Sequence, residues 1–257
     1  MLVLSDVLRP LLYCRVLDAT VVALATALAA CAADDGASTA QGEDALTALG
    51  PEAYRAYAAL AIEGGLTPAA GTISVLGLRG LAIDGANHAT AFGHAFDDTL
   101  VVFAKDGRSV LRFAASTHPF ELHGVPGVPD VDGDHVADVG MIRPGVYDVA
   151  GRDRLIAGVA SYAVTQGGSG RLPGWRDVNH DGLLDDDERS AADRRHDSLT
   201  DILFHQGDGP AAPAAVGCQV LPGASIRSFI TAVGGAKAKF RYVLVDVTSR
   251  DTSALPR

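Results

Sequence analysis

Oxygen-bearing side chains recur at almost every second position of residues 177–188, which read Asp-Val-Asn-His-Asp-Gly-Leu-Leu-Asp-Asp-Asp-Glu. A hard cation such as Ca²⁺ takes roughly six to eight oxygen ligands, and a tight loop can supply them from alternate residues. Carboxylate or amide oxygens stand at positions one, three, five, nine and twelve, a glycine stands at six, and a backbone carbonyl is available at seven. The ligands predicted in this way are Asp177, Asn179, Asp181, Leu183 through its backbone oxygen, Asp185 and Glu188.

This spacing resembles the calcium loop of EF-hand proteins at each position that the metal needs. We therefore expect Ca²⁺ as a structural cofactor, because an exported protein meets calcium continuously. Residues 172–175 are unsuited to an entering helix because they contain Pro and Gly, whereas residues 188–195 can form an exiting helix. The alternative is a solvated acidic turn that binds no metal.

A second acidic segment, residues 130–138, reads Asp-Val-Asp-Gly-Asp-His-Val-Ala-Asp. Carboxylates again stand at positions one, three, five and nine, but a histidine replaces the glycine at six and position twelve is Met141. This departure from the calcium pattern favours a polar loop between strands, with a metal site as the alternative.

The sequence also contains one cysteine with a histidine nearby. A thiolate is a strong nucleophile, and an imidazole beside it can remove the thiol proton. Cys218 follows His205 by thirteen positions, so the two are candidates for a nucleophile and its base. The alternatives are a small buried apolar residue for Cys218 and a hydrogen-bonded core histidine for His205.

The N-terminal residues have the form of an export signal. The apolar run 20–30 is too short to span a bilayer but has the length of a signal-peptide core. It ends Leu-Ala-Ala-Cys31, which resembles the lipobox of bacterial lipoproteins. That resemblance implies a lipoprotein signal peptide over 1–30, acylation of Cys31, a flexible tether over 31–42, and membrane anchorage in the bacterial cell envelope. The alternative is a buried amphipathic helix with an ordinary core cysteine.

Composition limits the other functions. Asp and Glu number 31 against 21 Lys and Arg, so the formal net charge is -10. A nucleic-acid-binding protein normally presents a basic surface, so no nucleic-acid partner is expected. Hydrophobic residues make up 48% of the chain, which is enough for a folded core.

Short runs of β-branched and aliphatic residues dominate the chain beyond residue 70. The predicted strands are 72–78, 99–104, 109–115, 145–149, 156–164, 202–205 and 240–247. Asp106-Gly107 indicates a hairpin, and only residues 226–233 read as a late helix. A helical lead-in over 43–69, with Pro51 in the first turn of its helix, precedes the strands. We therefore expect a mainly β domain with a few helices, a sandwich or barrel-like sheet, over residues 70–250.

A series of short motifs follows the same order as in one enzyme family. The motifs are Gly77-Leu78-Arg79-Gly80, Asp97-Asp98-Thr99, Ser116-Thr117-His118-Pro119, Pro144-Gly145-Val146-Tyr147, Arg176-Asp177-Val178-Asn179-His180-Asp181, His205-Gln206-Gly207 and Gly217-Cys218-Gln219-Val220. In this order they resemble the L,D-transpeptidase catalytic domain of the YkuD type, a secreted β-rich fold.

The resemblance implies a cysteine acyltransferase that acts on peptidoglycan. Cys218 would attack a carbonyl of a stem peptide and form a thioester, His205 would act as base, and backbone N–H groups beside Cys218 would hold the developing charge. Gly207 and Gly217 would contribute to substrate binding. The sequence departs from the family at Ala215, Val216 and Gln219 around the cysteine. It therefore leaves open an alternative, a calcium-binding surface lipoprotein with a degenerate, non-catalytic domain of the same fold.

Overall fold

The computed structural model describes residues 48–93, 95–120, 127–207 and 215–257. The predicted signal peptide, Cys31, the tether and the first residues of the lead-in lie outside these ranges, so their assignments remain predictions. Within the described ranges, none of the helices combines the length and the apolar character that crossing a membrane requires.

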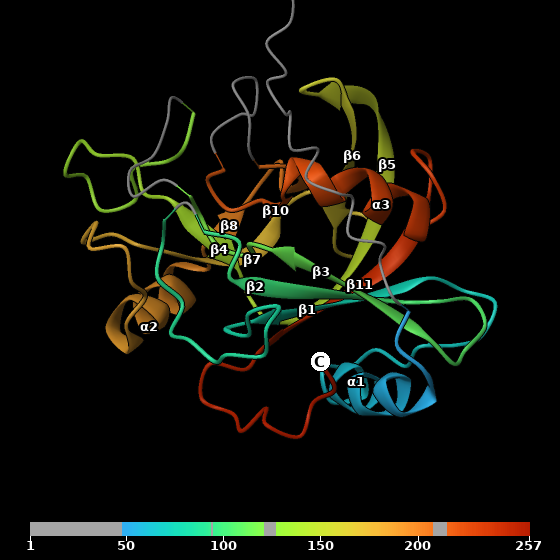
Figure 1. Ribbon diagram of the computed structural model, residues 1–257. Coiled ribbons are helices and arrows are strands. Elements are labelled where there is room, and N and C mark those ends of the chain that lie inside the picture. Colours follow the sequence, from blue (N-terminus) through green and yellow to red (C-terminus); the bar gives the residue numbers. More distant parts are fainter. Residues whose placement is uncertain (1–47, 94, 121–126, 208–214) are drawn as a thin grey trace, which may run out of the picture. The chain divides into compact units, whose positions relative to one another are not determined.

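Eight strands form one sheet that curls into a nearly closed barrel (Figure 1). Its order is β10-β9-β6-β5-β11-β1-β2-β3. The strands are β1 (Ser74–Arg79), β2 (Asp98–Phe103), β3 (Val110–Ala115), β5 (Gly145–Ile156), β6 (Val159–Thr165), β9 (Leu203–Gln206), β10 (Gln219–Leu221) and β11 (Lys239–Asp246). Two backbone hydrogen bonds of 2.9 Å between Ser116 and Val220 join the two edges of the sheet, just beyond β3 and within β10. The barrel therefore has a seam between β3 and β10.

A smaller sheet carries the acidic loops. It consists of β4 (Gly140–Ile142), β7 (Leu172–Arg176) and β8 (Ser198–Leu199), in the order β4-β7-β8. Residues 130–138 lead into β4, and residues 177–188 run from β7 into helix α2 (Asp186–Arg195). Because β4 and β7 pair in antiparallel fashion with Gly140 opposite Arg176, the loop that enters β4 and the loop that leaves β7 lie at the same end of the pair.

Alternating side chains divide the apolar residues between the inside and the outside of the barrel. On β11, Phe240, Tyr242 and Leu244 join the inner core, whereas Val243 and Val245 join the outer one. Helix α3 (Gly223–Ala232) adds Phe229 to the inner core, and helix α1 (Pro51–Glu63) covers the outer face with Tyr57 and Ala61. Strands β1 and β2 are buried along their whole length because both faces are covered.

The mainly β, barrel-like fold class expected from the sequence is confirmed. Each predicted strand corresponds to an observed one, and the late helix and Pro51 at the start of α1 are also present. The predicted strand 156–164 began too early, because Ala157 and Gly158 have φ of 51° and 75° and form the turn between β5 and β6. The strands β4, β7, β8 and β10, which have two to five residues, were missed because so short a run carries little alternation, although the four-residue β9 was predicted from the run 202–205.

Candidate functional site

The structure brings Cys218 and His205 to one pocket. Strands β9 and β10 pair in parallel, with His205 opposite Val220, and Cys218 directly precedes β10. Since side chains alternate along a strand, Cys218 and Val220 lie on the face that carries His205. Both residues line a pocket of about 390 Å³, together with Arg152, Arg154, Leu155, Ile156, Ala157, Asp201, Leu203 and Val216.

His205 is held as a neutral base. Its ring is buried, and Nδ1 lies 2.6 Å from the backbone oxygen of Gln206. A carbonyl can only accept, so Nδ1 carries the hydrogen and Nε2 is left with a free lone pair. Burial lowers the pKa of His205, and the hydrogen bond to Gln206 only partly opposes this effect. The imidazole is therefore uncharged at neutral pH and can accept a proton at Nε2.

Cys218 rests as a thiol. It is buried, and its Sγ–H donates weakly to the backbone oxygen of Asp201 at 3.8 Å. Burial raises its pKa to about 11, although a backbone hydrogen bond at Leu203 and the charge of Arg152 act in the opposite direction. Among the described residues, no hydrogen bond joins Cys218 to His205. The resting pair is thus a neutral thiol and a neutral imidazole in one pocket.

The two glycines predicted to bind substrate are required by close packing. A Cβ on Gly217 would lie 2.4 Å from the backbone oxygen of Gly140, and the φ of Gly217 is 134°. A Cβ on Gly207 would lie 2.8 Å from Cβ of Val220. Neither glycine is among the pocket-lining residues. Their contact with substrate remains a prediction, whereas their packing role explains why a larger residue cannot stand there.

Gln219, which departs from the family pattern, has a structural role beside Cys218. Its Oε1 accepts a hydrogen bond of 2.7 Å from the Tyr242 hydroxyl, and its Nε2 donates to the Gly217 oxygen at 3.4 Å. The side chains of Gln219 and Tyr242 are both fully buried, so these hydrogen bonds lie in the protein interior. The side chain thereby connects the backbone before Cys218 to the inner core, a contact that sequence reasoning did not foresee.

The loop 177–188 is folded by hydrogen bonds from its own backbone to its predicted ligands. The contacts are Gly182 N to Asp177 Oδ2 at 2.8 Å, Asp181 N to Asn179 Oδ1 at 2.9 Å and Leu183 N to Asp181 Oδ1 at 2.8 Å. Side chains one, three and five therefore fold back over the turn, each accepting from a later residue. Within the described chain, the Leu183 carbonyl accepts no hydrogen bond, so its oxygen is available as a backbone ligand.

Asp177 and Glu188 close this loop and are both buried. Oδ1 of Asp177 is shielded from solvent and has no hydrogen-bond partner in the described structure. Glu188 accepts from the backbone N–H groups of Val178 and Asn179 through Oε1 and from that of Asp185 through Oε2. Burial raises the pKa of both carboxyls, and the charge of Asp177 adds to the effect on Glu188. The loop therefore buries two neighbouring carboxylates, a costly arrangement that a bound cation would relieve.

The exiting helix is confirmed. Asp185 caps α2 by accepting from Glu188 N at 2.8 Å, and the Glu188 side chain returns the contact to the Asp185 backbone as a capping box. The predicted ligands of this loop do not, however, form a set of three acidic residues whose ligand atoms all lie within 4.8 Å of one another. Asp185 and Glu188 instead accept hydrogen bonds from the backbone at the start of the helix.

The second acidic segment does form such a set. Asp130, Asp132 and Asp138 each offer one oxygen within 4.8 Å of the others, so this group could hold a metal ion. Its backbone repeats the pattern of the first loop, with contacts of 2.9 Å from His135 N to Asp130, 3.1 Å from Asp134 N to Asp132 and 2.7 Å from Val136 N to Asp134. The expectation of a polar loop holds, and the carboxylates also meet the geometric requirement of a metal site. The signal in the sequence was the carboxylate spacing one, three, five and nine.

His180 connects the two acidic loops. It occupies position four of the first loop, and its Nε2 lies 3.1 Å from Oδ1 of the buried Asp138 in the second. Its Nδ1 lies 3.7 Å from Oδ2 of Asp134. The two loops therefore share a side-chain contact between residues that are 42 positions apart in the sequence.

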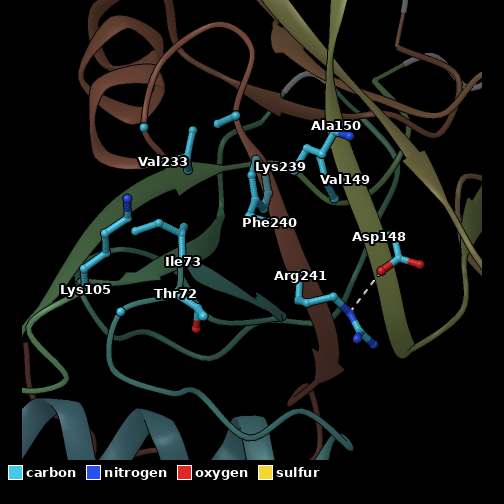
Figure 2. A pocket seen from close by; sticks show the side chains of 13 residues that line it. Thr72, Ile73, Lys105, Asp148, Val149, Ala150, Val233, Lys239, Phe240 and Arg241 are labelled. Atoms are coloured by element: carbon cyan, nitrogen blue, oxygen red, sulfur yellow. Dashed lines mark ion pairs between the residues drawn. The ribbon is translucent and has the colours of Figure 1, made fainter.

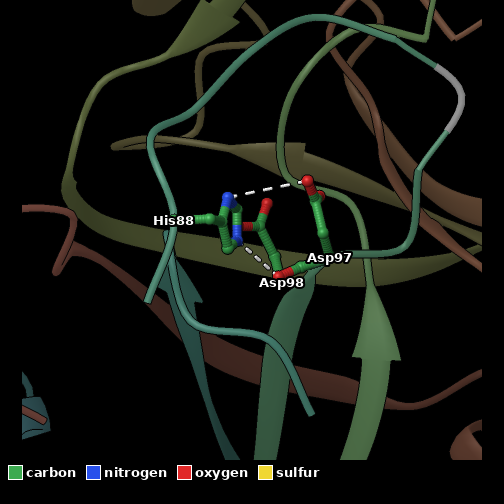
Figure 3. A group of neighbouring side chains, drawn as sticks. All are labelled: His88, Asp97 and Asp98. Atoms are coloured by element: carbon green, nitrogen blue, oxygen red, sulfur yellow. Dashed lines mark hydrogen bonds and ion pairs between the residues drawn. The ribbon is translucent and has the colours of Figure 1, made fainter. Parts of the chain in front are cut away.

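A further group of candidate ligands, His88, Asp97 and Asp98, lies at the start of β2 and in the segment before it (Figure 3). Both oxygens of Asp98 already accept hydrogen bonds, from Gly80 N at 2.7 Å and from the backbone and hydroxyl of Thr117 at 2.8 Å each. The Asp98 carboxylate is thus satisfied by protein donors. This group acts as a structural anchor between segments distant in the sequence.

His118 completes that anchor as a buried cation. Its Nε2 lies 2.8 Å from Oδ1 of Asp97 and its Nδ1 lies 3.1 Å from the Pro119 oxygen, so both nitrogens face acceptors. Burial alone would lower the pKa of His118, but the hydrogen bond to Asp97 and the charge of Asp98 outweigh it, and the pKa is raised. The imidazolium in turn lowers the pKa of Asp97, overcoming the effect of burial on that carboxyl.

A larger pocket, of about 730 Å³, lies between β5, β11 and the turn before β1 (Figure 2). An ion pair of 3.2 Å between Arg241 and Asp148 crosses one side of it. The described residues that line it include neither a cysteine nor a histidine. The larger pocket volume therefore does not identify the reactive site, and the Cys218–His205 pocket is the stronger candidate because it contains a nucleophile and a base.

The candidate chemistry of this chain consists of the Cys218–His205 pocket and the two acidic loops. Compared with protein-family models, with curated proteins and with solved structures, the chain gives no match.

Proposed function

We propose that this chain is an exported lipoprotein whose barrel acts as a cysteine acyltransferase on peptidoglycan stem peptides. The observation that carries the proposal is that Cys218 and His205 line one pocket, on the same face of two paired strands. The motif order that resembles L,D-transpeptidases supports the substrate, and the lipobox-like residues ending at Cys31 support the location.

The reaction follows from the neutral resting pair. The Cys218 thiol gives its proton to Nε2 of His205 as Sγ attacks the peptide carbonyl, and an S–C bond forms. The C–N bond then breaks, and the departing amine takes the proton from the imidazolium, leaving a thioester. A second amine, or water, attacks the thioester and passes its own proton to His205, which returns it to the departing thiolate.

Because burial keeps Cys218 protonated, proton transfer accompanies the attack instead of preceding it. General-base assistance of this kind is typically worth about 10²–10⁴-fold in rate. The thiol is consequently a weak nucleophile at neutral pH until a substrate carbonyl lies beside it.

The test is to incubate the full chain with a tetrapeptide stem from peptidoglycan and to measure the intact mass. We expect an acyl adduct that maps to Cys218, disappears when an acceptor amine is added, and is absent in Cys218→Ala. His205→Ala should slow its formation by about 10²–10⁴-fold. An adduct that survives in Cys218→Ala, or no adduct with the unaltered chain, would contradict the proposal.

We propose in addition that Ca²⁺ is a structural cofactor at residues 177–188. The support is the buried, unpartnered Oδ1 of Asp177, because a buried carboxylate oxygen without a donor is stabilised by a cation. Asp177, Asn179, Asp181, Asp185, Glu188 and the Leu183 carbonyl would hold the ion, which would tie the end of β7 to the start of α2. Calorimetric titration with Ca²⁺ should show binding that Asp177→Ala weakens.

One observation favours the second candidate, a calcium-binding surface lipoprotein without catalysis. The thiol of Cys218 has a pKa of about 11 and is not hydrogen-bonded to His205 in the described structure. The two experiments above separate the candidates. Calcium binding without an acyl adduct supports the second, and an adduct supports the first.

A further inference from the structure

An irregularity in the β5–β6 hairpin lies at the Cys218–His205 pocket. Gly151 pairs with Tyr162 and Leu155 pairs with Ala160, so β5 advances four residues while β6 advances two. The residues between the two pairs, 152–154, therefore bulge out of the ladder. Bulges redirect side chains and are common next to active sites.

The flanks of this bulge are held by the turn that precedes β11. A Cβ on Gly151 would lie 2.1 Å from the backbone oxygen of Ala236, and Gly151 N donates to Ala238 O at 2.9 Å. Asp153 forms an ion pair with Lys237. Arg152 and Arg154, on either side of Asp153, instead line the pocket.

Both arginines are available to a ligand. Arg152 is half-buried and Arg154 is exposed, and neither guanidinium forms a hydrogen bond or an ion pair within the described part of the chain. The pocket also contains the carboxylate of Asp201, so two positive charges face one negative charge while His205 is neutral. This surface is positive on a chain whose net charge is -10.

We propose that Arg152 and Arg154 form an anion-binding side of the pocket and that the acyl donor carries a carboxylate near its scissile carbonyl. Arginine binds carboxylates through two parallel hydrogen bonds, which fixes orientation as well as charge. The inference rests on the proposed function, because it assigns the substrate of the same nucleophile. Leu155, whose side chain is 58% exposed on the same hairpin, would contact an apolar part of that donor.

The test compares two alkylating reagents that differ in charge but share a leaving group. Iodoacetate and iodoacetamide each form an S–C bond with the thiolate and release iodide. The full chain is treated with each reagent, and the rate at Cys218 is measured by mass spectrometry of its peptide, apart from those of Cys14 and Cys31. The ratio of the two rates cancels the thiolate fraction and reports only how the pocket treats a carboxylate.

We expect the iodoacetate-to-iodoacetamide ratio to be at least about fivefold higher in the native chain than in the chain unfolded in urea, since a unit charge nearby favours the anion. Arg152→Gln should lower the ratio about fivefold, and the double variant with Arg154→Gln should bring it to the unfolded value. Arg227→Gln removes the same charge from the exposed face of α3 and should leave the ratio unchanged.

The outcomes separate the two proposals. If Cys218 reacts with both reagents but the ratio is equal in the native and unfolded chains, or unaffected by both arginine variants, the anion-binding side is refuted and the nucleophile stands. If neither reagent reaches Cys218 in the native chain while the unfolded chain reacts, the proposed nucleophile fails and this inference fails with it.

Discussion

Replacing Asp177 with asparagine tests the calcium loop most directly, because it removes one charge while changing few atoms. The asparagine Oδ1 can still accept from Gly182 N, the contact that Asp177 makes at 2.8 Å. The other carboxylate oxygen, the buried atom of Asp177 that has no hydrogen-bond partner, is replaced by the uncharged NH₂ group of asparagine. The variant should therefore fold in the absence of calcium and lose much of its response to calcium.

The magnitude follows from binding linkage. With a dissociation constant of about 10 μM, 1 mM Ca²⁺ stabilises the folded chain by about 2.7 kcal/mol. For a domain of this size that corresponds to a rise in Tm of about 5–10 °C. A loss of about 100-fold in affinity reduces the gain to about 0.4 kcal/mol, a rise in Tm of about 1–2 °C.

The assay is thermal unfolding followed by circular dichroism, in EDTA and in 1 mM Ca²⁺. In EDTA we expect Asp177→Asn to be at least as stable as the unaltered chain, because burial of an unpaired carboxylate is costly. Asp186→Asn is the matched control, because it removes the same charge from an exposed position in the first turn of α2, outside the predicted ligands.

Two results would refute the reasoning. One is a calcium-induced rise in Tm for Asp177→Asn that equals that of the unaltered chain. The other is a calcium response that Asp186→Asn loses as fully as Asp177→Asn, which would indicate a general charge effect instead of a defined site.

Three further predictions concern the pocket and the barrel seam. The alkylation rate of Cys218 by iodoacetamide should rise about tenfold per pH unit from pH 7 to 10, because burial raises the thiol pKa to about 11, and a plateau near pH 8.5 would contradict this. Folding raises the pKa of His118 and lowers the pKa of Asp97. The charged pair therefore stabilises the fold fully between the ordinary Asp pKa of 3.8 and the ordinary His pKa of 6.5. This stabilisation is lost as the pH rises through the pKa of His118 in the folded chain. His118→Gln should therefore cost about 1–3 kcal/mol in urea unfolding at pH 6 and less at pH 9, and an equal cost at both values would exclude the charged pair. Gly217→Ala should destabilise the chain by about 3 kcal/mol or more, measured by the same method, because its Cβ would lie 2.4 Å from the Gly140 oxygen at a φ of 134°. A neutral effect would show that the backbone at Gly217 and β4 can move apart.

The strands and the hairpin could be predicted because their signals are local. Asp106-Gly107 and the flanking aliphatic runs specify β2, the turn and β3, with Gly107 at a φ of 65°. Four of the five shortest strands could not be predicted from such local signals. β10 has three residues, and it becomes a strand only because β9 and Ser116 offer it hydrogen-bonding partners from elsewhere in the chain.

In the acidic loops, too, the local turns could be predicted from the sequence, whereas contacts between distant segments could not. The spacing in 177–188 predicted the turn, because each side chain accepts from a residue two to five positions later. The spacing one, three, five and nine in 130–138 was the signal for its carboxylate cluster, whereas no spacing predicted that His180 would lie 3.1 Å from Asp138. That contact depends on β4 and β7 pairing side by side.

The sequence by itself determined the residue types of the site, the turns and the alternation that buries one face of each strand, because these follow from chemistry within a few residues. Tertiary structure decided how those groups behave. It buried Cys218 and so raised its pKa to about 11, left Nε2 of His205 unprotonated, and turned Arg152 toward the pocket through a bulge held by a distant turn. Solvent exclusion and electrostatic environment are sums over contacts from the whole barrel, so no single segment of the sequence contains them.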